Sequence, residues 1–261
     1  MADAGLQQTP FVKQLAANDR PTRDKAVESL RSYLGSQRAF SQIELLKLWK
    51  GLFYCMWMSD RPRTQQRLAI DLADLLTPME ETNFVSFLEA FWATMAREWN
   101  GIDVLRMDKF LLLVRTYLAG SFRYLRARKW EAGIVEKVVR SLKEVPLNST
   151  DKKVPNGLRF HLIDIYVDEM EKLKPEEMTS NPLPLEKLLE PFKVLVIKSP
   201  TKLVRTRSKD LLLDGRLAAW GFEGAPEGKK KKQNVEAEAV NQSNEDVAMD
   251  VGDEEWGGID G

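Results

Sequence analysis

His161 is the only histidine of the 261-residue chain, and it lies one helical turn before Asp164. A histidine beside a carboxylate is a common acid–base pair in enzymes. Such chemistry also needs a nucleophile, an orienting group and a site that stabilises negative charge, and the sequence signals none of these near His161. We therefore expect His161 and Asp164 to serve the fold and not a reaction.

Cys55, the single cysteine, is the other candidate nucleophile. Its neighbours in the chain are apolar, and apolar surroundings raise the pKa of a thiol and so reduce its reactivity. One cysteine excludes an intrachain disulfide framework and any multi-cysteine zinc site, and it indicates a reducing, intracellular compartment. The sequence also lacks a Gly-rich phosphate loop, a dinucleotide fingerprint and a His-Glu-x-x-His motif. We expect no enzyme activity, cofactor, metal or small-molecule substrate.

Two clusters of basic residues are the candidates for binding. The first lies within 115–129, where cations alternate with Phe122, Tyr124 and nearby Trp130, a pattern suited to phosphates and unstacked bases. The second cluster lies along the last predicted helix. A solvated basic face with its aromatic residues in the core explains either cluster as well, and both interpretations stay open. The residues proposed to bind RNA or a protein partner are Arg123, Arg126, Arg128, Lys129, Lys198, Lys202, Arg205, Arg207 and Lys209.

Equal numbers of basic and acidic residues, 39 of each, hide a difference between two parts of the chain. Residues 224–261 carry four lysines and ten acids, so the preceding part has a basic excess. A basic body with an acidic tail suits a protein that works near nucleic acid. The same residues include few large apolar side chains, so burial cannot offset their chain entropy, and we expect a disordered tail.

Two features of this tail are candidates for recognition. Lys229, Lys230, Lys231 and Lys232 match a short nuclear-localisation signal. Trp256 lies among acids and glycines. It is either the anchor of an acidic peptide that docks on a basic partner or an exposed aromatic residue without one.

The elements that carry these residues are all predicted to be helices, because apolar residues recur at spacings of three and four and no stretch alternates with period two. Asp19, Ser41 with Glu44, and Asp103 indicate helix starts. The predicted helices are 10–18, 21–34, 41–59, 62–76, 81–99, 103–118, 158–173, 185–197 with a kink at Pro191, and 200–213 with Ser199 as its cap. Residues 122–142 form one further helix or two.

Helix starts recur about every 20 residues, so helix pairs recur about every 40, a spacing typical of HEAT-like or armadillo-like solenoids. An irregular helical bundle has the same spacing. We expect an all-α fold of about ten helices. Its parts are a flexible segment 1–9, a helical repeat-like domain 10–223 and a low-complexity tail 224–261. No apolar run approaches the ~20 residues that cross a bilayer, so we expect no membrane partner.

The stretch Leu48–Asp60 is the densest run of large apolar residues, which follow one another without a break from Phe53 to Met58. A helix that is apolar around its whole circumference has to be buried on all sides. We expect this helix to be the centre of the fold. Replacing Trp57 by alanine is accordingly predicted to lower the free energy of unfolding by ~3–5 kcal/mol.

Several blocks of the sequence resemble one family. Leu48–Asp60 is similar to the signature of the nucleolar ribosomal RNA processing protein 1 family, and 15–25, 91–110 and 155–166 resemble its other blocks. The resemblance covers residues 10–220. It implies a non-enzymatic helical scaffold in the nucleus and nucleolus, bound to precursors of the large (60S) ribosomal subunit and required for processing of their ribosomal RNA.

The same resemblance implies partners among the large-subunit assembly factors, including β-propeller and Brix-type proteins, and contacts with pre-ribosomal RNA and ribosomal proteins. It assigns no catalytic residue. An alternative interpretation of the helices is a nuclear solenoid adaptor that binds peptide motifs of proteins unrelated to ribosomes. That alternative predicts a groove with regularly spaced asparagine or aromatic side chains, and the sequence shows no such series.

Overall fold

The computed structural model describes residues 10–15, 17, 19–36, 38–173 and 182–223, and the regular structure in these ranges is helical throughout. The helices are α2 (Pro10–Leu15), α3 (Arg20–Leu34), α4 (Gln42–Trp57), α5 (Pro62–Asp74), α6 (Glu81–Glu98), the 3₁₀ helix η1 (Trp99–Gly101), α7 (Val104–Ala127), α8 (Ala132–Glu144), α9 (Asn156–Glu171), α10 (Leu185–Leu188), α11 (Glu190–Lys198), α12 (Lys202–Leu212) and α13 (Gly215–Ala219). The all-α prediction is confirmed. Within these ranges, no helix has both the length and the apolar composition that crossing a membrane requires.

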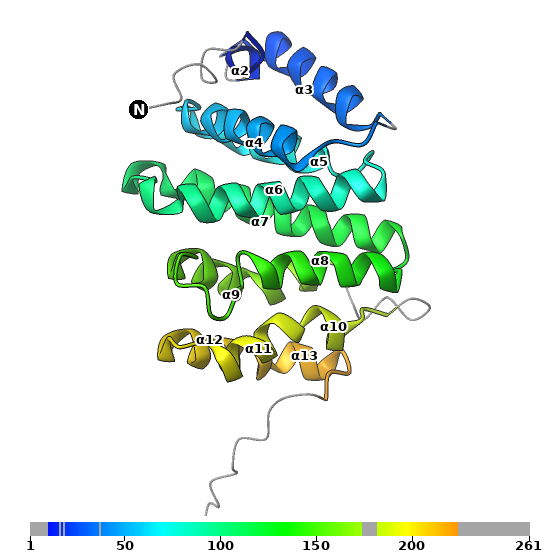
Figure 1. Cartoon of the computed structure of the whole chain (residues 1–261), viewed down its shortest axis with the longest axis vertical. Coiled ribbons are helices and arrows are strands. Elements are labelled where there is room, and N and C mark those ends of the chain that lie inside the picture. The colour runs from blue at the N-terminus through cyan, green and yellow to red at the C-terminus, as the bar shows by residue number, and fades with distance from the viewer. Residues whose placement is uncertain (1–9, 16, 18, 37, 174–181, 224–261) are drawn as a thin grey trace, which may run out of the picture. The chain divides into compact units, whose positions relative to one another are not determined.

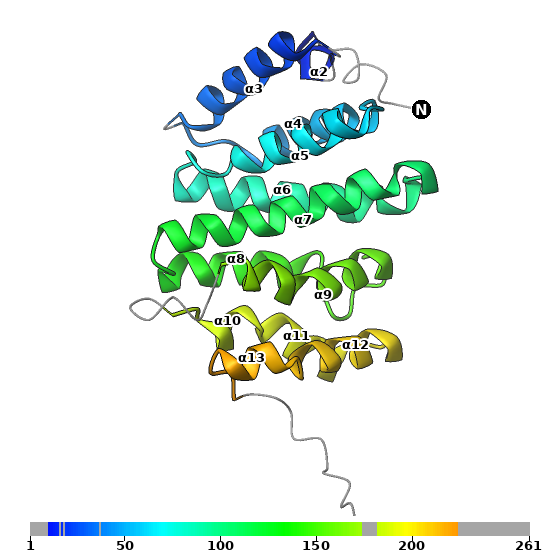
Figure 2. The same ribbon diagram turned by 180° about the vertical axis from the view of Figure 1, so that it is seen from behind.

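Consecutive helices form pairs, and the pairs stack on one another (Figure 1). In one series α4 packs against α6, α6 against α8, and α8 against α10 and α11. In the other series α5, α7, α9 and α12 follow in the same order, as Figure 2 shows from behind. Each pair thus contacts the pairs before and after it. This is the arrangement of a helical solenoid, so the solenoid interpretation holds for the described helices and the irregular bundle does not.

Local sequence signals start several of these helices where they were predicted. Ser41 and Glu44 form a reciprocal capping box: Ser41 Oγ accepts from the Glu44 N–H at 3.3 Å, and Glu44 Oε2 accepts from the Ser41 N–H at 3.0 Å. Asp19 caps α3 and Asp103 caps α7 through their side-chain oxygens. These bonds satisfy backbone N–H groups that have no partner within the first helical turn.

The predicted end of a helix at 118, before Gly120, is wrong, because α7 continues past it. A Cβ at position 120 would lie 3.1 Å from Leu76 Cδ1 and 3.3 Å from the Ala73 carbonyl oxygen. Gly120 therefore serves the close approach of α5 to α7 and does not end the helix. The turn comes later, where Lys129 and Trp130 have positive φ angles of 53° and 56°. Residues 122–142 accordingly belong to two helices.

At the C-terminal end of the described chain, one predicted boundary is confirmed and another is wrong. The predicted kink at Pro191 is seen as a break between α10 and α11, with the proline in the first turn of α11. Helix α12 has Thr201 as its N-cap, so Ser199 is not the cap. The short helix α13 was not predicted.

Trp49 lies at the centre of the largest aromatic cluster among the described residues. Its side chain is fully buried, and its ring centroid lies 5.1, 4.8 and 4.9 Å from those of Phe87, Phe91 and Tyr117. The indole Nε1–H donates to the Phe87 carbonyl oxygen at 3.1 Å. Trp49 thereby joins α4 to α6 and α7, so the apolar helix forms part of the core. Its pair lies toward the N-terminal end of the stack and not at its centre (Figure 1).

The prediction that α4 is buried on all sides is wrong at the last turn of this helix. Trp57 is only half-buried and Met58 is 64% exposed, because the helices around α4 leave one side of this turn uncovered. The Trp57 ring contacts Phe53 and Phe110 at centroid distances of 5.9 and 6.1 Å, and the Arg106 guanidinium lies 4.9 Å above it. The loss of stability predicted for Trp57→Ala is therefore too large.

Candidate binding groove and basic clusters

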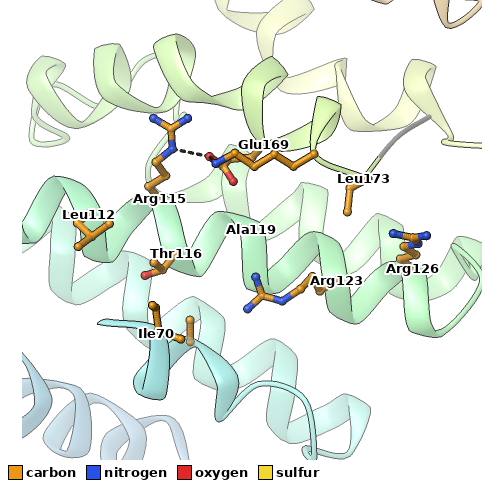
Figure 3. A pocket seen from close by; sticks show the side chains of 11 residues that line it. Ile70, Leu112, Arg115, Thr116, Ala119, Arg123, Arg126, Glu169 and Leu173 are labelled. Atoms are coloured by element: carbon orange, nitrogen blue, oxygen red, sulfur yellow. Dashed lines mark hydrogen bonds and ion pairs between the residues drawn. The ribbon is translucent and has the colours of Figure 1, made fainter. Parts of the chain in front are cut away.

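A groove of about 350 Å³ runs across α5, α7 and α9, which are neighbours in one series of the stack (Figure 3). Its apolar lining comes from Ile70 and Ala73 on α5, Leu112 and Ala119 on α7, and Leu173 just after α9. Ile70 is 51% exposed, so it contributes accessible apolar surface to the groove. The groove therefore offers apolar surface that a bound partner would cover.

The rim of the groove is basic. Its lining includes Arg115, Arg123, Arg126 and Lys172 and one carboxylate, Glu169. The Glu169 side chain is 2% exposed and pairs with Arg115, as drawn in Figure 3, and with Lys172 at 2.7 Å. A buried carboxylate needs such compensation. The pair with Arg115 joins α7 to α9, and the exposed part of the rim keeps a positive excess.

The structure separates the residues of the first predicted basic cluster. Arg126 and Lys129 are exposed and have no side-chain partner among the described residues. Arg123 is exposed but pairs with Asp74 at 3.0 Å. Arg128 is half-buried, and its guanidinium lies 3.5 Å from the Tyr124 ring centroid. The same guanidinium donates to the carbonyl oxygen of Met79, which lies between α5 and α6. Arg128 therefore stabilises the fold, and Arg126 and Lys129 remain available to a partner.

The aromatic residues of this cluster cannot stack on bases in the arrangement seen here. Phe122, Tyr124 and Trp130 are all buried. The Phe84 and Tyr124 rings stack with centroids 3.5 Å apart, and the Tyr124 hydroxyl donates to the Met79 carbonyl oxygen at 3.0 Å. The alternative that placed these aromatic residues in the core is the correct one.

The second basic cluster is also divided. Lys198 and Lys202 are exposed, without a side-chain partner in the described ranges. Arg205 donates to the carbonyl oxygens that precede α12 at 2.7 and 3.0 Å. Arg207 pairs with Asp164 at 3.3 Å and lies over a half-buried phenylalanine of α9. Lys209 is half-buried. Arg205 and Arg207 hold α12 in place, which leaves Lys198 at the end of α11 and Lys202 at the start of α12 for binding.

His161 and Asp164 do not face each other as an acid–base pair. The His161 Nε2–H donates to the Leu111 carbonyl oxygen at 2.9 Å, and burial holds its pKa below the ordinary value of 6.5. Asp164 pairs with Arg207 instead. Burial raises the pKa of the Cys55 thiol to about 12, so it stays protonated at neutral pH. No cluster of three or more potential metal ligands occurs in the described part of the chain.

The predicted tail features, Lys229–Lys232 and Trp256, lie outside the described residues. The groove was missed by the sequence reasoning because its lining comes from positions about a hundred residues apart in the chain, which only the stacking of α5, α7 and α9 brings together. No local signal marks the groove, because periodicity alone does not separate an exposed aliphatic residue such as Ile70 from a buried one.

The chain matches the sequence model of a family described as nucleolar protein, Nop52, over residues 6–259. The chain belongs to the Nop52 family. The relatives of this Nop52 chain include human ribosomal RNA processing protein 1 homolog A, which is 36% identical over 254 residues, covering 95% of the chain and 52% of the relative. Human homolog B is 40% identical over 72% of the chain and 25% of its own length. The Drosophila melanogaster homolog is 32% identical over 67% of the chain.

The family resemblance seen in the sequence is therefore confirmed. The Nop52 chain spans about half the length of the first of these relatives and a quarter of the length of human homolog B. The description of the family connects it with the nucleolus, and the names of the relatives connect it with ribosomal RNA processing.

Proposed function

We propose that this Nop52 chain is a non-enzymatic ribosome biogenesis factor that acts in ribosomal RNA processing. It binds nucleolar precursors of the large (60S) ribosomal subunit as a helical scaffold, and processing of their RNA requires it. The family match over residues 6–259 is the observation that carries the proposal, because the relatives are named ribosomal RNA processing proteins. The stacked helices support a scaffold, since solenoids present extended surfaces to partners.

The groove across α5, α7 and α9 supports binding of a protein segment. Its apolar lining and basic rim fit a segment that combines apolar and acidic side chains. We assign this role to a large-subunit assembly factor, with β-propeller and Brix-type proteins as the candidates. Arg126, on the rim and without a partner among the described residues, is the residue that tests it.

Charge reversal of Arg126 should weaken recovery of the groove's partner while the helical content stays unchanged. Lys47→Glu is the matched control, because Lys47 is exposed on α4, outside the groove. Equal recovery of every assembly factor with Arg126→Glu and Lys47→Glu would refute the role of the groove.

Import into the nucleus and nucleolus is assigned to Lys229–Lys232. A fluorescent reporter that carries residues 224–261 should accumulate in the nucleus. The same reporter with the four lysines replaced by alanine should remain in the cytoplasm, and nuclear accumulation of that variant would contradict the assignment.

The function itself is tested by affinity purification of the tagged chain, with mass spectrometry of the proteins and sequencing of the RNA. Recovery of large-subunit assembly factors together with precursor ribosomal RNA is expected. The second candidate is a nuclear solenoid adaptor, which the apolar groove also favours, although the lining of the groove includes no asparagine or aromatic side chain. Recovery of importins or cargo proteins without large-subunit precursors would favour the adaptor and refute the first proposal.

A further inference from the structure

A second hollow, of about 300 Å³, lies on an edge of the helical stack, away from the groove. It is lined by Asn100, residues 149–156, Arg159 and residues 199–201, which come from three turns, α6–α7, α8–α9 and α11–α12, and from the first turn of α9. These turns follow one another along the edge seen on the left in Figure 1 and on the right in Figure 2. The stacking of the pairs thus brings three polar turns to one place.

Two lysines line this hollow, and two more adjoin its lining residues in the sequence. Lys152 and Lys153 line it, and Lys198 and Lys202 directly precede and follow the lining residues 199–201. All four are exposed, and none has a hydrogen bond or ion pair through its side chain within the described residues. The other charged residues of the lining are Asp151, which is exposed, and Arg159, which is buried. The accessible charge at and beside the hollow is therefore positive.

Buried Arg159 holds the α8–α9 turn in shape. Its guanidinium donates to the carbonyl oxygens of Asn148, Asp151 and Val154 at distances of 2.7 to 3.1 Å. Asn148 Oδ1 in turn accepts from two backbone N–H groups of the same turn, at 3.0 and 2.9 Å. Free carbonyl oxygens would favour a bound cation over an anion. Arg159 occupies these oxygens and so removes that preference. The turn is fixed and presents its two lysines to an anion.

We propose that this hollow binds the phosphate backbone of RNA. The inference rests on the proposed function, because the pre-ribosomal particle supplies the RNA. Interfaces with nucleic acid are polar and positively charged, as this hollow is, whereas protein interfaces are built around an apolar core. The lysines come from two turns of neighbouring pairs, so they can contact more than one phosphate, and a nucleotide chain provides several phosphates in succession. Lys152 and Lys153 extend the basic cluster at the start of α12 into this site.

The test compares the full chain with a variant in which Lys152, Lys153, Lys198 and Lys202 are replaced by glutamine. A fluorescein-labelled single-stranded 20-nucleotide RNA is titrated at several salt concentrations. The variant should bind about tenfold or more weakly, and its log Kd should depend less steeply on log salt, by up to ~0.7 per lost phosphate contact. Lys25→Gln with Lys47→Gln, two exposed lysines on α3 and α4, is the control and should bind as the unchanged chain does.

Unchanged affinity and salt dependence in the four-lysine variant would overturn the proposal. Displacement of the RNA by millimolar inorganic phosphate would also overturn it, because the site would then hold a single anion. A polyglutamate peptide that binds the unchanged chain as tightly as the RNA does, and binds the four-lysine variant more weakly, would also overturn the proposal. The hollow would then fit an acidic protein.

The two proposals fail in different ways. If the tagged chain recovers large-subunit precursors while the four lysines prove dispensable for RNA binding in vitro, the site is wrong and the function stands. If the variant loses RNA binding in vitro but the unchanged chain recovers no large-subunit precursor, the hollow is an RNA site and the proposed function is wrong.

Discussion

Trp49 and Trp57 lie two turns apart on α4, and the structure predicts clearly different costs for their replacement by alanine. Trp49 is fully buried among three aromatic rings and donates a hydrogen bond to a carbonyl oxygen of α6. Truncation of a buried tryptophan lowers the free energy of unfolding by ~3–5 kcal/mol, and the aromatic contacts place Trp49→Ala near the upper value.

Trp57 makes fewer contacts and is only half-buried. We expect Trp57→Ala to cost ~2–3 kcal/mol, including ~0.5–1 kcal/mol for the loss of the Arg106 guanidinium above its ring. The two variants should therefore differ by ~2 kcal/mol. With an m-value of about 3 kcal/mol/M, this difference separates their urea midpoints by roughly 0.7 M.

Urea unfolding followed by far-ultraviolet circular dichroism measures this difference without using the tryptophans as probes. The two variants must show the same m-value for the midpoints to be compared. Equal midpoints, or a lower midpoint for Trp57→Ala, would refute the view that the core is centred on Trp49.

Two further predictions concern single positions. Gly157→Ala should lower the free energy of unfolding by ~1–2 kcal/mol, because the new Cβ would lie 2.8 Å from Nε1 of buried Trp99. Gly133→Ala is the comparison: its Cβ would meet only Glu131 Oε1, at 4.0 Å, so this substitution within α8 should raise the free energy of unfolding by up to ~1 kcal/mol. Equal effects in thermal unfolding would contradict the close contact. Because burial lowers the pKa of His161, the unfolded chain binds more protons as the pH falls through 6.5, and stability is lost there. Between pH 7.5 and 5.5 the unchanged chain should therefore lose more stability than His161→Gln, and equal losses would show that His161 does not titrate differently on unfolding.

The helices could be predicted from the sequence wherever a local signal decides the outcome. The side chains of Asp19, Ser41 and Asp103 accept hydrogen bonds from N–H groups of their own helices. Four consecutive residues therefore suffice to predict each of these helix starts. Gly120 could not be interpreted in this way. Whether a glycine ends a helix or admits a neighbour depends on α5, which lies far away in the chain.

The binding surfaces could be predicted only in part for the same reason. A basic residue is available to a partner only if the fold does not already pair it, and its partners lie about one helix pair away in sequence. Arg207 pairs with Asp164 and Arg123 with Asp74, whereas Lys198 and Lys202 have no such partner in the described ranges. The sequence identified the basic clusters, and the stacking of helices decided which of their members remain exposed.

The most direct test of the proposed function is the state of the precursor ribosomal RNAs after the protein is depleted from cells. We predict that precursors of the large-subunit RNAs accumulate while the small-subunit RNA matures at its normal rate, and that the full chain restores processing. Unchanged levels of all large-subunit precursors after complete depletion, or an equal defect in both subunits, would contradict the account.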